Sequence, residues 1–83
     1  MSDVVQVHLF AAARAAAGQS VLTCRPGNLD DVLDQLRSQA PGLDAVLPRC
    51  SFLVDGQAIH GDHATVLCEP GARLDVLPPF AGG

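Results

Sequence analysis

The sequence has 83 residues and a formal net charge of -4, with 9 acidic residues against 5 basic residues that are all arginine. A chain of this length can bury only about 60% of its unfolded surface, so it forms one domain with one core and has little room for an enclosed substrate pocket. Because phosphate binding needs clustered cations and these arginines are dispersed, the composition disfavours a nucleic-acid partner and suits a basic protein surface.

The first secondary-structure signal is a strand over residues 4–10. These residues are rich in valine and partly alternate apolar with polar side chains, which places Val5, Val7 and Leu9 on the core side. His8 is expected on the exposed side of the same strand.

A short helical segment and a second strand follow. The alanine-rich residues 11–17 favour one or two helical turns that end at Gly18. Residues 20–24 predict a strand antiparallel to the first, because the connection between them is short. Residues 25–28 predict a type II turn in which Gly27 supplies the positive φ.

The clearest signal in the chain is an amphipathic helix over residues 29–40. Its apolar residues recur at spacings of three, four and seven, at Leu29, Val32, Leu33, Leu36 and Ala40. Asn28 is a favourable N-cap, and two aspartates follow in the first turn, where the helix dipole favours negative charge. Pro41-Gly42 ends the helix, and residues 43–47 are expected to add one short turn.

The second half of the chain is predicted to form short strands joined by tight turns. Residues 51–54 and 57–59 flank Asp55-Gly56, a two-residue hairpin signal, and residues 65–67 precede a turn at Pro70-Gly71. Residues 73–77 form the last strand. Pro78-Pro79 cannot donate to a ladder, so the sheet ends there.

This order of elements predicts an α+β domain over residues 1–77 and an extended, flexible C-terminal tail over residues 78–83. The domain is expected to wrap a mixed sheet of about five strands round one main helix, because that helix has a single apolar stripe to bury. The crossover between parallel strands is expected to be right-handed.

Few side chains indicate chemistry of their own. His60, Asp62 and His63 are metal-ligand types, but they lack a fourth ligand, and a solvated loop accounts for them as well. The cysteines are widely spaced without a CxxC pair and are interpreted as small core residues, at Cys24, Cys50 and Cys68. No serine, cysteine or lysine comes with a base and an orienting acid, so we expect no self-contained active site, no metal and no intrinsic cofactor.

The N-terminal residues Met1-Ser2-Asp3 are acidic where a secretory signal is basic, and Arg14 interrupts the longest apolar run. We therefore expect a cytoplasmic protein without a membrane span.

The tail is the strongest candidate for a functional site. Pro78-Pro79 favour an extended exit, so the last six residues can project by roughly 20 Å. Gly82-Gly83 then present the terminal carboxylate on a backbone that can enter a narrow cleft without Cβ clashes. We expect Gly83 to be the reacting group and the preceding residues to bind a partner, namely Pro78, Pro79, Phe80, Ala81 and Gly82. Phe80 is the candidate anchor, because aromatic residues are enriched at interface hot spots.

Four segments resemble the small subunit of molybdopterin synthase, a ubiquitin-like sulfur carrier with the β-grasp fold. They are residues 9–18, the helix that ends at Pro41, the Asp55-Gly56 turn, and residues 77–83. The first and last segments are the specific ones. The alanine-rich segment with Arg14 favours the molybdopterin carrier over the similar carriers for thiamin and cysteine.

The resemblance implies a function for the terminal carboxylate. A ubiquitin-activating-like adenylyltransferase would use Mg-ATP to adenylate Gly83, and sulfur from a persulfide would displace AMP to leave a thiocarboxylate. The tail would then enter the large subunit of molybdopterin synthase, where the sulfur forms the dithiolene of molybdopterin during molybdenum cofactor biosynthesis. Because the partners supply the catalytic groups, the chain is implied to be a non-catalytic carrier subunit.

The chain also departs from that family. Residues 71–74 read Gly-Ala-Arg-Leu where the family often has Gly-Asp-Glu-Val, which alters the docking surface expected at Ala72 and Arg73. Three alternatives stay open: a carrier for thiamin, cysteine or tRNA thiolation, a ubiquitin-like modifier joined to target lysines through Gly83, and a noncovalent binding module.

Overall fold

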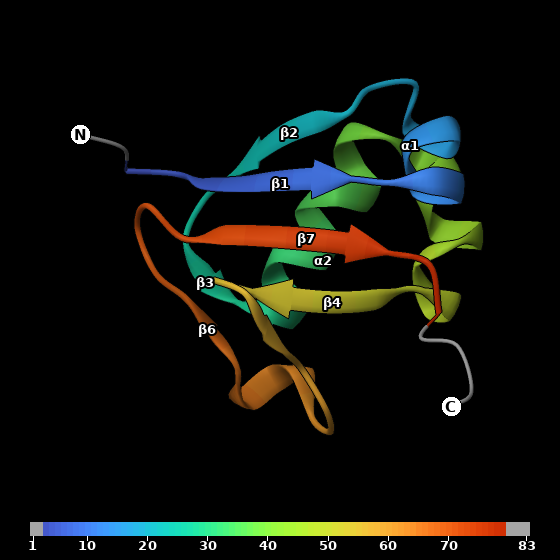
Figure 1. Cartoon of the computed structure of the whole chain (residues 1–83). Coiled ribbons are helices and arrows are strands. Elements are labelled where there is room, and N and C mark those ends of the chain that lie inside the picture. Colours follow the sequence, from blue (N-terminus) through green and yellow to red (C-terminus); the bar gives the residue numbers. More distant parts are fainter. Residues whose placement is uncertain (1–2, 80–83) are drawn as a thin grey trace.

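The centre of the molecule is a mixed five-stranded sheet with the strand order β2-β1-β7-β4-β5 (Figure 1). The computed structural model describes residues 3–79. The strands are β1 (Val5–Leu9), β2 (Val21–Cys24), β4 (Ser51–Val54), β5 (Gln57–Ala58) and β7 (Arg73–Leu77). β1 and β7 pair in parallel, whereas the other neighbours pair antiparallel. The predicted mixed sheet around one main helix is therefore confirmed.

The main helix, α2 (Leu29–Gln39), packs against one face of this sheet. The Asn28 side chain caps it, since its Oδ1 accepts a 2.8 Å hydrogen bond from the Asp31 backbone amide. The predicted apolar face is buried, with Leu29, Val32 and Leu36 at 0% exposure. The opposing sheet face supplies Val5, Val7, Leu74 and Val76, which are also fully buried. The apolar side chains of β1 therefore face the core, as the sequence predicted.

A small second sheet pairs β3 (Gly27–Asn28) with β6 (Leu67–Cys68). The predicted turn at Gly27 is wrong in its geometry. Gly27 pairs with Cys68, and the described glycines with positive φ are Gly18, Gly56, Gly61 and Gly71. Gly27 is extended because it pairs with β6 just before α2 begins. Gly71, in the predicted Pro70-Gly71 turn, does have a φ of 84°.

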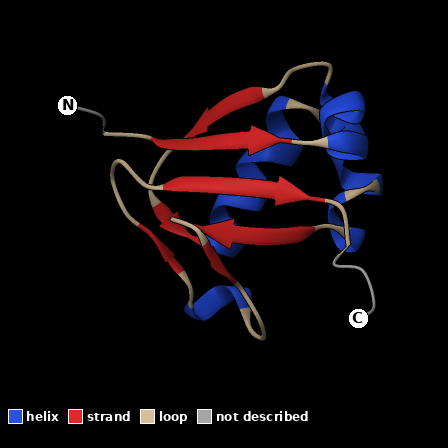
Figure 2. Cartoon of the chain, viewed as in Figure 1, coloured by secondary structure: helices blue, strands red, loops and turns tan. Residues whose placement is uncertain are grey.

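Short helices form several of the remaining connections (Figure 2). They are α1 (Ala11–Ala17) and the 3-10 helices η1 (Pro41–Ala45), η2 (Leu47–Arg49) and η3 (His63–Thr65). α1 ends at Gly18, whose φ is 72°, as predicted. η1 packs closely against α1, because a Cβ on Gly42 would lie 2.8 Å from the Ala16 carbonyl oxygen. Only glycine fits at this contact without displacing one of the two helices.

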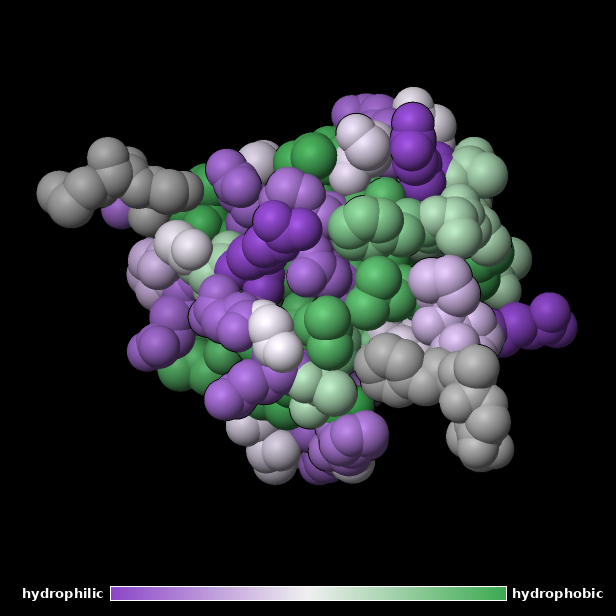
Figure 3. Space-filling model, viewed as in Figure 1, coloured by the Kyte–Doolittle hydropathy of each residue, from purple (hydrophilic) through white to green (hydrophobic). Residues whose placement is uncertain are grey.

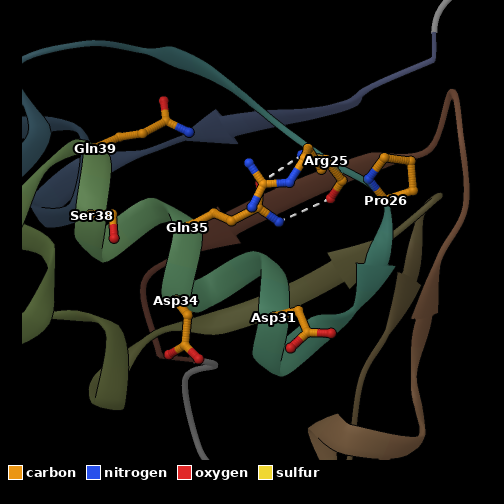
Figure 4. A pocket seen from close by; sticks show the side chains of 7 residues that line it. All are labelled: Arg25, Pro26, Asp31, Asp34, Gln35, Ser38 and Gln39. Atoms are coloured by element: carbon orange, nitrogen blue, oxygen red, sulfur yellow. Dashed lines mark hydrogen bonds between the residues drawn. The ribbon is translucent and has the colours of Figure 1, made fainter.

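Two glutamines from α2 bond the backbone at the carboxyl end of β2, an end strand of the sheet, and at the residue that follows it (Figure 4). The Arg25 amide donates to Gln35 Oε1 at 2.7 Å, and Gln35 Nε2 donates to the Arg25 carbonyl at 3.1 Å. Gln39 Nε2 donates to the Thr23 carbonyl at 2.8 Å. These side chains occupy backbone groups that an exposed strand edge would otherwise leave open.

Within residues 3–79, no helix is both long and apolar enough to cross a membrane.

Leu36 lies at the centre of the buried face of α2, so we expect the Leu36→Ala variant to lose about 2–5 kcal/mol of unfolding free energy. Urea denaturation followed by circular dichroism measures this loss. Ser38→Ala, an exposed change in the same helix, is the matched control and should shift the value by less than about 0.5 kcal/mol. Equal effects of the two substitutions would contradict the central position of Leu36.

Candidate functional site

The C-terminal exit lies where the two parallel central strands end. β1 and β7 run in the same direction, so their carboxyl ends meet at one edge of the sheet. The Phe10 amide donates to the Val76 carbonyl at 3.1 Å and extends this ladder by one residue. β7 ends at Leu77, and Pro78 and Pro79 follow as exposed residues. The predicted end of the sheet before the two prolines is confirmed.

An apolar groove of about 320 Å³ opens beside these prolines. Three chain segments that are distant in the sequence form it: the start of α1, the η1–η2 region and the exit itself. Its lining consists of Phe10, Ala11, Ala12, Ala13, Ala45, Val46, Arg49, Cys50, Pro78 and Pro79. Sequence reasoning did not find this groove. One signal for it was the apolar Phe10, the last residue of the predicted strand, which lies just beyond β1 and is 39% exposed.

The backbone at the edge of the groove is strained. Ala11, the first residue of α1, has a φ of 52°, in the left-handed region that residues with a Cβ seldom adopt. Only Phe10 separates this position from β1, so the chain must turn sharply from strand into helix. The turn holds Phe10 beside the helix and presents its ring to the groove lining.

The outer face of the sheet has two unlike halves (Figure 3). Hydrophobic residues gather over the carboxyl ends of β1 and β7 and beside α1, whereas hydrophilic residues gather over the starts of these strands. Arg73, the first residue of β7, forms an ion pair with Asp75 of the same strand, with 2.8 Å between Arg73 Nε and Asp75 Oδ1. Ala72 is buried at 6% exposure. The departure at residues 72–73 therefore leaves one basic side chain on the surface at the start of β7.

The predicted site residues fall into two groups. Pro78 and Pro79 stand at the exit, as described above. Phe80, Ala81, Gly82 and Gly83 lie outside the described residues, so their roles stay predictions.

The histidine-containing loop has structural contacts instead of a metal site. Among residues 3–79, no three His, Cys, Asp or Glu side chains gather in a way that could hold a metal ion. Asp62 caps η3 by accepting a 2.9 Å hydrogen bond from the Ala64 amide. The His63 ring meets the Phe52 ring edge-on at 5.3 Å, and its Nδ1 lies 3.8 Å from Asp30 Oδ1. These contacts attach the loop to β4 and α2.

The cysteines are not arranged as nucleophiles. Cys24 and Cys68 are buried, as predicted, and Cys50 is half-buried in the wall of the groove. Burial raises the pKa of Cys24 to about 11, and burial also raises the pKa of Cys50 and of Cys68. The Cys50 thiol donates to the Val46 carbonyl at 3.2 Å. All three therefore stay protonated at neutral pH, and the thiolate is the reactive form.

Comparison with known proteins places the fold. The model of the ThiS family matches residues 7–83. The structure of small archaeal modifier protein 1 from Methanosarcina acetivorans is 28% identical, with a TM-score of 0.82, and the match covers 100% of this chain and 99% of that chain. A search of the curated proteins finds no match.

Two further solved structures share the fold at lower identity. One is the complex of subunits 1 and 2 of molybdopterin-converting factor from Helicobacter pylori, at 21% identity and a TM-score of 0.68, where the match covers 96% of this chain and 99% of that chain. The other is the BexX/CysO complex of Amycolatopsis orientalis, at 19% identity and a TM-score of 0.79, with 95% and 99% covered. The β-grasp, ubiquitin-like fold expected from the sequence is confirmed.

The strained turn at Ala11 generates a prediction for a pair of neighbouring variants. We expect Ala11→Gly to leave the unfolding free energy unchanged or to raise it by up to about 1 kcal/mol, because glycine adopts positive φ without steric cost. Ala12→Gly, the matched control in regular helix, should lower it by about 0.5–1 kcal/mol. Thermal denaturation of both variants measures the difference, and equal losses would contradict the left-handed geometry.

Proposed function

The chain belongs to the ThiS family of ubiquitin-like sulfur carriers, and from this premise we propose that it is the sulfur-carrying small subunit of a molybdopterin synthase. The observation that carries the proposal is the C-terminal exit. The central strand β7 leads straight into two exposed prolines, and the sequence continues to Gly82-Gly83. The residues after Pro79 have no reactive side chain in the sequence, which supports the terminal carboxylate as the reacting group.

A carboxylate must be activated before it can accept sulfur. In the proposed first step, a Gly83 carboxylate oxygen attacks the α-phosphorus of ATP on the adenylyltransferase, and pyrophosphate leaves. The terminal sulfur of a persulfide then attacks the acyl carbon, AMP leaves with its oxygen, and an acyl disulfide forms. A thiol of the sulfur-delivering protein cleaves that S–S bond, is oxidised to a disulfide with the donor sulfur, and releases the thiocarboxylate.

The side chains of this domain serve recognition in the proposed cycle. The protonated thiols described above leave no ready nucleophile among the cysteines, and the sequence has no lysine. Catalytic groups and Mg-ATP then belong to the partners, which makes the chain a carrier subunit. Because activation uses ATP, we place the protein in the cytoplasm.

Two features support molybdopterin as the pathway. The segment that resembles the molybdopterin carrier, residues 9–18, forms the turn and α1 beside the exit, where a partner must approach the tail. The Helicobacter pylori structure with the same fold is a complex of two converting-factor subunits. We accordingly propose a large second subunit as the partner that receives the tail, with Phe80 as its anchor.

A covalent protein modifier is the second candidate function. It is favoured by the 28% identity with a small archaeal modifier protein over essentially the full length of both chains. In this reading, Gly83 forms an isopeptide bond with a lysine amine of a target after the same activation. The chain itself offers no lysine side chain for such a bond.

The carrier function predicts a mass change at the terminus. After incubation with a ThiS-type activating enzyme, Mg-ATP and a persulfide donor, the intact mass should rise by the exchange of one oxygen for one sulfur. Deleting Gly83 should abolish the rise and leave the melting temperature unchanged, since residues 3–79 form the core without it. An unchanged mass of the intact chain with an active enzyme would refute the sulfur-carrier role.

A second prediction separates the two candidate functions. Pull-down with the thiocarboxylated chain should recover a large synthase subunit, and the recovered complex should convert cyclic pyranopterin monophosphate to molybdopterin. The Gly83-deleted chain is the control and should support no conversion. A ladder of lysine-linked conjugates on immunoblots, without such a complex, would favour the modifier function instead.

A further inference from the structure

The groove at the exit is an apolar surface beside the start of the tail. Its walls are mostly alanine, valine, proline and phenylalanine side chains, and Phe10 within it is 39% exposed. The hollow along α2 is different, because it is lined by Arg25, Asp31, Asp34 and other polar residues (Figure 4). We propose that the Phe80 ring of the same chain occupies this apolar groove while the carrier is free of partners.

Chain connectivity supports this occupant. Pro79 is itself part of the groove lining, and Phe80 is the next residue. A group attached directly to the wall of a binding site has a high effective concentration there, far above that of a separate molecule. Phe80 is also the one aromatic residue among the last six residues of the sequence.

The lining suits a ring. The groove of about 320 Å³ borders Ala11 and Ala12, whose short side chains leave space above the helix. Phe10 supplies an aromatic partner, and aromatic pairs are favourable in edge-to-face or offset geometry. Arg49 stands at the same groove and is exposed, so its guanidinium is available to cover a ring face.

The docked ring would link two states of the tail. In the free chain, the ring holds the start of the tail against its own domain. In the complex, the same ring leaves the groove and anchors the tail in the partner. This second state rests on the proposed function, whereas the docking itself is a property of the free chain and is measured without any partner.

Fluorine NMR tests the docking directly. The chain has three phenylalanines, so uniform labelling with 4-fluorophenylalanine gives three signals, assigned by single Phe→Leu variants. Phe52, at 5% exposure, is the internal reference for a buried ring. A soluble gadolinium chelate then reports how far each ring is open to solvent. Because fast exchange averages docked and free positions, a ring docked in roughly three quarters of molecules should relax about fourfold less than a free one.

One variant adds a charge to the groove lining, which should displace the Phe80 ring, and its control adds the same charge outside the groove. Ala12→Glu puts a carboxylate in the lining, whereas Ala15→Glu makes the same change at an exposed position of α1 outside the groove. We expect Phe80 to be shielded in the wild-type chain and in Ala15→Glu, and to relax about fourfold faster in Ala12→Glu. Phe80→Ala should likewise expose the Phe10 fluorine.

Three results would overturn the proposal. Phe80 relaxation equal to that of the free peptide Pro-Pro-Phe-Ala-Gly-Gly would show an undocked ring. Shielding that grows with protein concentration would assign the groove to a second copy. Protection of Phe10 only after a partner is added would assign it to that partner. If Phe80 is docked but the mass gain at Gly83 is not seen, the sulfur-carrier function is refuted and the docking proposal is still supported.

Discussion

The parallel pairing of β1 with β7 is the constraint on which the rest of the molecule depends. It joins the first and last strands of the chain at the centre of the sheet, with Val7 beside Leu74 and Leu9 beside Val76. Because parallel strands end at the same edge, the segment after β1 and the segment after β7 emerge side by side. α1 and the two exit prolines therefore become neighbours although they are far apart in the sequence. The direction of the two strands is therefore enough to place the exit prolines beside α1.

The spacing of apolar residues was enough to predict most helices and strands, because each spacing places those residues on one face of a helix or strand. The alternation of Val5, Val7 and Leu9, and the helical spacing of Leu29 to Leu36, each defined one core face. Gly27 was misread because Pro-Gly is a strong turn signal, and nothing nearby in the sequence shows that Cys68 pairs with it. β6 has only two residues, which is too short for an alternating pattern that would predict its pairing with β3.

The candidate site was predictable only in part, for a related reason. A functional tail was predicted from composition, since Pro-Pro favours an extended start and Gly-Gly has no side chains, and its role stays a prediction. The groove could not be predicted, because its walls come from residues 10–13, 45–50 and 78–79, which meet only after the sheet and η1 are in place. Gly42 illustrates the dependence, since its value lies in the close approach to Ala16, a residue 26 positions earlier. The pathway is hard to predict for a similar reason. In the proposed function the reacting group is a backbone carboxylate, so the difference between a sulfur carrier and a protein modifier would lie in the surfaces that select partners.

The glutamine cover on β2 has a consequence for how this protein meets others. A strand added along β2 would have to displace Gln35 and Gln39 from the Arg25 and Thr23 backbone groups before it could form its own ladder. The glutamines thus hinder the addition of a further strand at the carboxyl end of β2, which disfavours edge-to-edge pairing there. The opposite edge is β5, only two residues long. A partner strand would consequently find few open backbone groups at the ends of the sheet, so the faces of the domain offer more surface for recognition than its edge strands do.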